Sequence, residues 1–299
     1  MLSRRNVIAL LGVSLATAAV PALAQTPAKI PVVATFSILA DFARNVGGDR
    51  IEVISLVGPN GDAHVYQPTP DDAKNLRAAR LILVNGLKLE GWMDRLIKAS
   101  GSTAPVIVAT KGVQPLESEE NGHKGLDPHA WQSIDNAKIY VANIRDALAA
   151  ADPDGAATYR ANASAYVAQL DKLDAEVRAA IAKIPEKHRE IITTHDAFGY
   201  FGAAYGFRFI APEGVSTEAE PSARDVAKII RQIKAEKIPA VFLENISDPR
   251  ISRRIAEESG AKIGGTLFSD ALSPQDGPAG TYIDMMRNNI RQLTSALAE

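Results

Sequence analysis

The chain has 299 residues, of which 46% are hydrophobic and 23% charged, and its formal net charge is −2. This length suffices for one large domain or two smaller ones, and the composition excludes a disordered protein. The near-neutral charge, with no basic run interleaved with aromatic residues, excludes a nucleic-acid partner.

The first 24 residues have the pattern of a secretory signal peptide. Arg4 and Arg5 supply the positive n-region, Val7 to Val20 the apolar h-region, and Ala22-Leu23-Ala24 a small-residue cleavage site. A stretch of about 14 apolar residues is too short to span about 30 Å of hydrocarbon. We therefore expect residues 1–24 to direct export to the periplasm and to be removed.

Residues 25–152 alternate short β-branched runs with amphipathic patterns, which is typical of an α/β lobe with a parallel sheet. The Thr69-Pro70-Asp71-Asp72 sequence supplies an N-cap, a proline at the first helical position and a capping-box acid. The expected strands are Pro31–Thr35, Ile51–Leu56, Leu81–Val84 and Pro105–Ala109. The expected helices are Ile38–Val46, Pro70–Arg80, Gly91–Ala99 and Ser133–Ala150.

Residues 153–185 form a different kind of segment, with no strand pattern and an apolar residue every third or fourth position. This spacing predicts one helix of about 28 residues and about 40 Å, with a single apolar stripe. A coiled-coil dimer is the alternative, but a seam of tyrosine and alanine makes a weak zipper. We expect a rigid helix that joins two lobes of a monomer.

Residues 186–299 repeat the rhythm of the first half, which predicts a second α/β lobe. Ser222 and Asp225 form another capping box, and Gly260 is a natural helix stop. The expected strands are Glu190–Thr194, Arg208–Ala211, Ala240–Glu244 and Lys262–Leu267. The expected helices are Ala197–Tyr205, Ala223–Ala235, Asp248–Ser259 and Thr281–Ala298.

Four side chains that can bind a metal follow expected strands, two in each lobe. His64 and His129 follow strands of the first lobe, and His195 and Asp270 follow strands of the second. Ligand sites of open α/β sheets form outside the carboxyl ends of the strands, so facing lobes would bring the four together. Each residue alone is more often a solvated loop residue or a cap. Their shared position favours a nitrogen-rich, four-coordinate metal site of the kind that suits Zn²⁺.

The other two histidines have no such position. His188 lies between Lys187 and Arg189 and is interpreted as a solvated surface residue. His123 lies in the acidic, glycine-containing stretch 117–125, where solvent exposure is the simpler interpretation and an encounter with incoming metal the alternative.

Four segments resemble the signature blocks of a known family, the zinc/manganese solute-binding proteins of ABC transporters (cluster A-I, or cluster 9). These segments are His64–Pro70 (HVYQPTP), Asp127–Trp131 (DPHAW), Thr194–Phe201 (THDAFGYF) and Phe268–Leu272 (FSDAL). They occur in the family's order and cover essentially the whole mature chain. The resemblance implies two Rossmann-like βα lobes joined by one long rigid helix.

The same resemblance implies the ligands and the partner. His64, His129, His195 and Asp270 would bind a divalent metal ion between the lobes, and an inner-membrane ABC permease would receive it. Family members tuned to manganese often have glutamate at the position of His195, so this histidine favours Zn²⁺. Many zinc members carry a long histidine-rich loop between the first two ligands, which this chain lacks, so Mn²⁺ or dual selectivity stays open.

The sequence has no cysteine. This excludes disulfide bonds, thiolate metal ligands and a cysteine nucleophile. A bacterial lipoprotein is anchored through a cysteine just after its cleavage site, so we expect a periplasmic protein that is not lipid-anchored.

Residues near the four ligands can support them. A metal-binding imidazole needs a partner for its other ring nitrogen, and Asp127, Asp196 and Glu244 are candidates by neighbourhood. Trp131 and Tyr200 are candidates for the walls of the site, although core packing is the more usual role of such residues.

Two other functions fit parts of the pattern. An exported zinc-dependent hydrolase would use three ligands and leave the fourth position to water, but the sequence contains no H-E-x-x-H motif. A receptor for an organic solute would line its cleft with aromatic and anchoring polar groups, whereas these strand ends carry histidine. We expect a receptor and not an enzyme.

Overall fold

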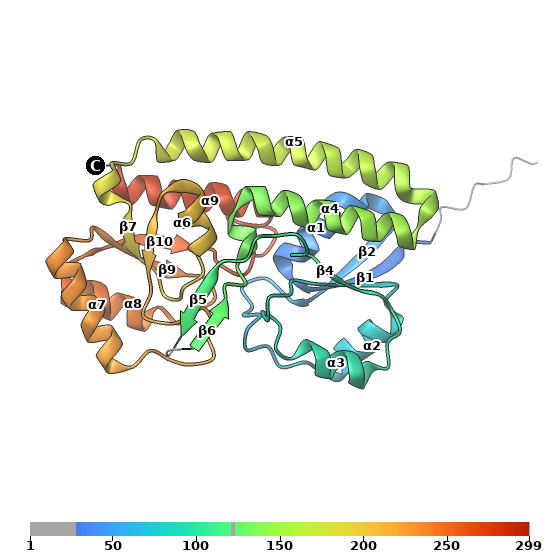
Figure 1. Ribbon diagram of the computed structural model, residues 1–299, viewed down its shortest axis with the longest axis horizontal. Helices are drawn as coiled ribbons and strands as arrows, with labels where there is room; N and C mark the ends of the chain where they lie inside the picture. Colours follow the sequence, from blue (N-terminus) through green and yellow to red (C-terminus); the bar gives the residue numbers. More distant parts are fainter. Residues whose placement is uncertain (1–27, 121–122, 299) are drawn as a thin grey trace, which may run out of the picture.

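The computed structural model of the protein describes residues 28–120 and 123–298, so the expected signal peptide at 1–24 lies outside the described residues. Two parallel four-stranded sheets form the framework, in the orders β2-β1-β3-β4 and β10-β9-β7-β8. The sheets belong to two lobes that lie next to each other along the long axis, and one long helix, α5, runs past both (Figure 1). This is the predicted α/β architecture.

The first lobe follows the predicted alternation of strands and helices. In the middle of its sheet, β1 pairs with β2 and β3, and the run Val32–Phe36 is buried because helices cover both faces. The capping box of Thr69 and Asp72 is formed at the start of α2. The strands are β1 (Ile30–Phe36), β2 (Ile51–Val57), β3 (Leu81–Val84) and β4 (Val106–Val108); the helices are α1 (Ser37–Gly47), α2 (Pro70–Ala78), α3 (Met93–Ser100) and α4 (Ile134–Ala151).

The second lobe has the same plan. Ser222 caps α7 through its side chain, and Gly260 ends α8 in the left-handed conformation, as predicted. The strands are β7 (Glu190–Ile192), β8 (Arg208–Ile210), β9 (Ala240–Glu244) and β10 (Lys262–Leu267); the helices are α6 (Gly199–Tyr205), α7 (Ala223–Glu236), α8 (Pro249–Ser259) and α9 (Tyr282–Leu297).

One element was not predicted. The stretch expected to be an acidic loop contains an antiparallel pair of strands, β5 (Glu117–Glu120) and β6 (His123–Leu126), with Glu117 opposite Leu126. The pair projects where the two lobes meet (Figure 1). Its glutamates, lysine and glycine have low strand propensity, and no alternating apolar pattern marks the two strands, so the sequence resembles a loop.

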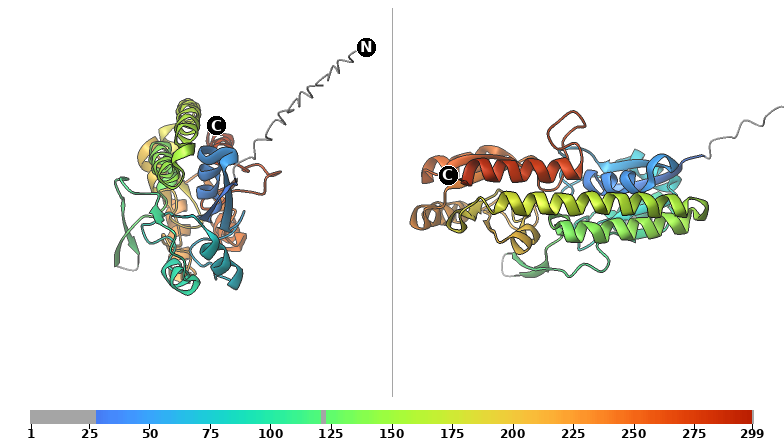
Figure 2. Two further views of the ribbon diagram at one scale, coloured as in Figure 1. Left: turned by 90° about the vertical axis from the view of Figure 1, so that its right-hand side faces the viewer. Right: turned by 90° about the horizontal axis from the view of Figure 1, so that it is seen from above.

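Helix α5 (Ala156–Ile181) has 26 residues and carries the predicted stripe on its inner face. The buried members of the stripe are Tyr159, Ala163, Tyr166, Leu170, Leu173, Val177 and Ile181. They pack on α1 and α4 of the first lobe and on α9 of the second. From above, α5 runs past α1 and α9, which follow each other along the long axis (Figure 2). The stripe is thus covered within one chain, which removes the reason for a coiled-coil dimer. Among the described residues, no helix is long and apolar enough to cross a bilayer.

Asp41 links the lobes inside this helical layer. It lies on α1, is 7% exposed, and its Oδ2 accepts a hydrogen bond of 3.0 Å from the backbone N–H of Tyr282, the first residue of α9. The Tyr166 hydroxyl of α5 lies 3.5 Å from the same oxygen. Burial raises the pKa of Asp41 to about 6, although the Tyr282 N–H and Arg44 act in the opposite direction.

The raised pKa of Asp41 predicts a pH-dependent stability. Because the folded state holds this proton more tightly than the unfolded state, Asp41 favours folding most below about pH 4, and that contribution is lost as the pH rises through about 6. Relative to the wild type, metal-free Asp41→Asn should therefore gain about 2 kcal/mol in the free energy of unfolding between about pH 4.5 and 7.5. Urea unfolding at both pH values measures this gain. Parallel pH profiles for the two proteins would contradict it.

Candidate metal centre

The four predicted ligand residues come together at one point between the lobes. One nitrogen or oxygen of each of His64, His129, His195 and Asp270 lies within 4.8 Å of the others, and all four residues are buried. Each follows the carboxyl end of a strand or hairpin: β2, β6, β7 and β10, in that order. The parallel strands β2, β7 and β10 thus direct their following loops toward the interlobe cleft, and the antiparallel hairpin β5–β6 leads into the loop of His129.

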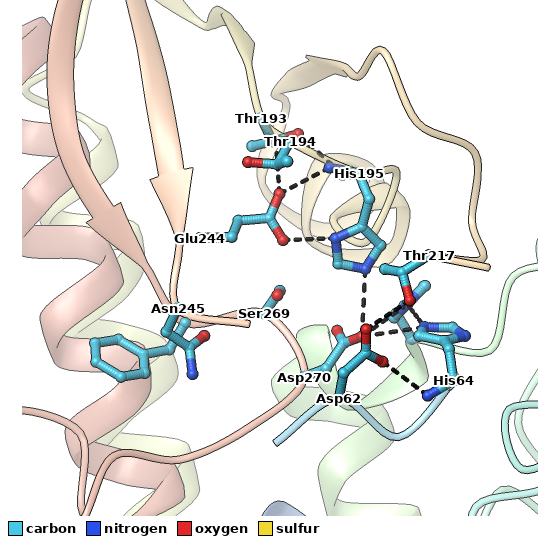
Figure 3. Close-up of polar contacts among 12 residues, drawn as sticks. Asp62, His64, Thr193, Thr194, His195, Thr217, Glu244, Asn245, Ser269 and Asp270 are labelled. Carbon is cyan, nitrogen blue, oxygen red and sulfur yellow. Dashed lines mark hydrogen bonds and ion pairs between the residues drawn. The ribbon is translucent and has the colours of Figure 1, made fainter. Parts of the chain in front are cut away.

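Asp270 occupies the middle of the cluster. Its Oδ2 lies 3.1 Å from His64 Nε2, 3.6 Å from His129 Nε2 and 3.3 Å from His195 Nε2. The Nε2 atoms of His64 and His129 are 3.2 Å apart. A tetrahedron with bonds of about 2.0–2.1 Å has edges of about 3.3 Å, so these separations suit a single Zn²⁺-sized ion. Figure 3 shows the carboxylate of Asp270 between His64 and His195.

Two carboxylates orient the imidazoles. Asp127 Oδ1 lies 2.8 Å from Nδ1 of His129 and also accepts its backbone N–H at 2.9 Å. Glu244, at the end of β9, lies 2.6 Å from Nδ1 of His195 and accepts the backbone N–H groups of Thr194 and His195 (Figure 3). The Nδ1–H of His129 that donates to Asp127 leaves Nε2 with a lone pair for a metal, and Glu244 places a carboxylate beside Nδ1 of His195. Asp196, the third candidate from the sequence, forms no such bond; it contributes its backbone N–H to the carbonyl of Gly214.

The electrostatics of the cluster depend on its one buried anion. Burial lowers the pKa of His129, but Asp270 and Asp127 outweigh burial and raise it to about 9. Burial also opposes the charged form of His195, and the carboxylates of Glu244 and Asp270 raise its pKa well above the usual range. Burial alone would raise the pKa of Asp270, whereas His129 and His195 hold it well below the usual range. The site is built to keep Asp270 ionised opposite cationic charge.

The loop of Asp270, in the second lobe, is held by residues of the first lobe. Trp131 Nε1 and Gln132 Nε2, which follow His129, donate to the carbonyl of Ser269 at 2.9 and 2.7 Å. Trp131 also packs its ring on the ring of His129, with centroids 5.3 Å apart. Trp131 is thus a wall of the site, as the sequence suggested.

The loop of His129 is fixed by residues of the second lobe. The Tyr200 hydroxyl donates to the carbonyl of Asp127 at 3.1 Å. A Cβ at Gly199 would lie 2.5 Å from Asp127 Oδ2, so a larger residue there would displace this carboxylate from its place beside His129. From the first lobe, Asn85 Nδ2 donates to the carbonyl of Pro128 at 2.9 Å, a contact that sequence analysis missed.

The remaining two histidines occupy other parts of the fold. His188 Nδ1 lies 3.0 Å from the carbonyl oxygen of Leu297, near the end of α9. His123 is the first residue of β6, opposite Glu120 in the hairpin register.

A two-lobe α/β fold with a rigid connecting helix and a buried cluster of three histidines and one aspartate is the architecture of a metal-binding receptor. The family described as "Zinc-uptake complex component A periplasmic" matches residues 32–296. The chain belongs to this family of substrate-binding receptors of metal ABC transporters. The family consists of receptors and not of enzymes, which excludes the hydrolase hypothesis.

Related proteins are named for different metals. The iron-binding protein YfeA of Yersinia pestis is 37% identical over 92% of this chain and 88% of its own. The manganese-binding lipoprotein MntA of Bacillus subtilis is 37% identical over 90% of both chains. The structure of the periplasmic zinc-binding protein TroA of Treponema pallidum superimposes with a TM-score of 0.86 at 34% identity, covering 91% of this chain and 100% of TroA.

The comparisons correct one prediction. Several relatives, including MntA, are named as lipoproteins, which contradicts the expectation of a protein that is not lipid-anchored. That expectation was wrong because it depended only on the absence of cysteine from this chain. The number of cysteines in this chain carries no information about how its relatives are anchored to the membrane.

Proposed function

We propose that this chain captures one divalent transition-metal ion, with Zn²⁺ favoured, through His64, His129, His195 and Asp270. The observation that carries the proposal is the clustering of four buried donor atoms within 4.8 Å, from loops that belong to both lobes. A buried carboxylate facing three imidazoles is costly to desolvate unless a cation or protons compensate it. A metal ion compensates this charge and replaces the protons held by the imidazoles.

The donor set supports zinc as the preferred cargo. Three imidazoles and one carboxylate form a set that suits Zn²⁺ in four-coordinate geometry. One observation favours manganese as the alternative, alone or with zinc: Asp270 Oδ1 is buried and has no hydrogen-bond partner among the described residues. This second oxygen could add a fifth bond, and manganese favours oxygen ligands and higher coordination numbers.

We further propose that the loaded receptor docks as a monomer on an inner-membrane ABC permease and binds no nucleic acid. The proposed division of the chain has a signal peptide at 1–24, an N-terminal lobe at 25–152, a linking helix at 153–185 and a C-terminal lobe at 186–299. The alternation of strands and helices on each side of α5 supports this division.

Competition between metals tests the proposed cargo. Purified protein, stripped of metal, is titrated with Zn²⁺ and Mn²⁺ separately and together, and bound metal is measured by elemental analysis. We expect one equivalent of Zn²⁺ to bind and to displace Mn²⁺ from the same site, as the order of affinities for nitrogen-containing sites requires. Displacement of bound Zn²⁺ by equimolar Mn²⁺ would favour the manganese alternative, and no stoichiometric binding of either would contradict the proposed function.

A further inference from the structure

The loop that carries His64 is tied to the opposite lobe at two places. The backbone N–H of Asn60 donates to the carbonyl of Leu272 at 2.9 Å, and Asn245 Nδ2 donates to Asn60 Oδ1 at 3.1 Å. Two residues further along, the Thr217 hydroxyl donates to Asp62 Oδ2 at 2.6 Å. The loop belongs to the first lobe, whereas all three partners belong to the second. These contacts therefore close the cleft beside the cluster.

Asp62 uses both carboxylate oxygens in this arrangement. While Oδ2 accepts the hydroxyl of Thr217, Oδ1 accepts the backbone N–H of His64 at 2.8 Å. Figure 3 shows Asp62 between the main chain of His64 and the side chain of Thr217. A hydrogen bond to an ionised carboxylate is stronger than one between neutral groups. Asp62 thus couples the position of His64 to a residue 155 positions away.

The segment of Thr217 is in turn tied to the residues around His195. The backbone N–H of Asp196 donates to the carbonyl of Gly214 at 3.0 Å, and that of Glu213 donates to the carbonyl of Thr194 at 3.3 Å. A path of hydrogen bonds therefore leads from His195, through the 213–217 segment and Asp62, to His64. It joins proposed ligands of opposite lobes without passing through the metal position.

His64 is the one of the four proposed ligands that borders a cavity. A cavity of about 360 Å³ opens on His64 and on none of the other three ligands, and its walls include Lys88, Lys124 and Ser216. His129 and His195 each have a carboxylate at Nδ1, whereas no hydrogen bond to Nδ1 of His64 is formed within the described part of the chain. His64 is thus fixed through its main chain, by Asp62, and not through its ring.

From these contacts we infer that Asp62 and Thr217 are positioning residues that hold His64 over the bound ion and slow its dissociation. The inference rests on the proposed function, because it takes His64 as a ligand. Loss of the Thr217 hydroxyl releases the loop of His64 from the second lobe. The ion then leaves through the cavity that His64 borders. The association rate of the ion depends on its encounter with the open cleft, so the substitution changes it little. The affinity for the ion therefore falls by the same factor by which the dissociation rate rises.

The test uses the zinc-loaded full chain mixed with excess chelator in a stopped-flow instrument. Thr217→Val keeps the shape of the side chain and removes the donor, and is expected to raise the dissociation rate of Zn²⁺ about ten-fold, as loss of one hydrogen bond to a charged group implies. Thr217→Ser retains a hydroxyl and should stay within about two-fold of the wild-type rate. Thr158→Val, an exposed substitution on α5, is the matched control and should leave the rate unchanged.

A purely structural role for Thr217 would also lower the thermal stability of the metal-free protein, so the melting temperature of each metal-free variant is measured alongside. The inference is overturned if Thr217→Val releases Zn²⁺ at the wild-type rate, or if Thr217→Ser releases it as fast as Thr217→Val. A wild-type protein that binds neither Zn²⁺ nor Mn²⁺ would instead remove the proposed function, and the inference with it.

Discussion

Replacing His195 with alanine is expected to weaken zinc binding by about 100-fold or more. Four-ligand zinc sites bind with about 10–16 kcal/mol, so one ligand accounts for roughly 3 kcal/mol, and every 1.4 kcal/mol is ten-fold in affinity. His195 is fully buried, its Nε2 lies 3.3 Å from Asp270 Oδ2, and Glu244 lies at its other ring nitrogen, so the substitution removes an oriented donor from the centre of the cluster. Isothermal titration with Zn²⁺, in competition with a chelator of known affinity, measures the change.

The matched control is His188→Ala, which removes an imidazole that is hydrogen-bonded to the carbonyl of Leu297 and lies outside the cluster. The affinity of the His188→Ala variant for zinc should equal that of the wild type. Because His195→Ala leaves Glu244 buried without its partner, the circular dichroism spectrum of the metal-free variant must first match the wild-type spectrum. Wild-type affinity in a folded His195→Ala protein would remove this residue from the ligand set.

Replacing Asp270 with asparagine should have an effect of similar or larger size, of about 100-fold or more. The change is nearly isosteric, but it removes the one carboxylate whose oxygen lies within 3.6 Å of three imidazole nitrogens. The amide oxygen that remains is neutral and a weaker ligand. Because manganese depends more on anionic oxygen ligands than zinc does, the affinity for Mn²⁺ should fall at least as far as that for Zn²⁺.

Parallel titrations of Asp270→Asn with Zn²⁺ and Mn²⁺ measure both losses. Asp154→Asn serves as the control, because Asp154 is exposed in the turn before α5. Retention of wild-type affinity for both metals in Asp270→Asn would show that this carboxylate does not bind the ion.

The fold was predictable because its local signals agree with its packing. The buried strands β3 and β9 coincide with their predicted ranges, since an apolar run of four or five residues between turns is too short for a typical helix. Helix α5 was predictable from its stripe, because the residues that recur every three or four positions are the ones that face α1, α4 and α9. The β5–β6 hairpin was not, because its polar strands differ little from a loop in composition.

The clustering of the four proposed ligands was predictable from the sequence, whereas their supporting contacts were only partly predictable. His64, His195 and Asp270 follow strands at the carboxyl edges of the two sheets, and chain order alone places them there, whereas the β5–β6 hairpin lies between β4 and His129. Sequence neighbourhood favoured Asp127, Asp196 and Glu244 equally, because it carries no information about side-chain direction; only Asp127 and Glu244 reach an imidazole. The contact of Asp62 with Thr217 joins different lobes, and no local pattern indicates it.

X-ray diffraction from crystals grown with one equivalent of Zn²⁺, recorded on both sides of the zinc absorption edge, tests the central claim most directly. The four donor atoms already lie within 4.8 Å of one another, so the ion needs little rearrangement to bind. One anomalous peak is expected, at about 2.0–2.2 Å from Nε2 of His64, His129 and His195 and from a carboxylate oxygen of Asp270. A peak elsewhere on the protein, with these four side chains unliganded, would contradict the account.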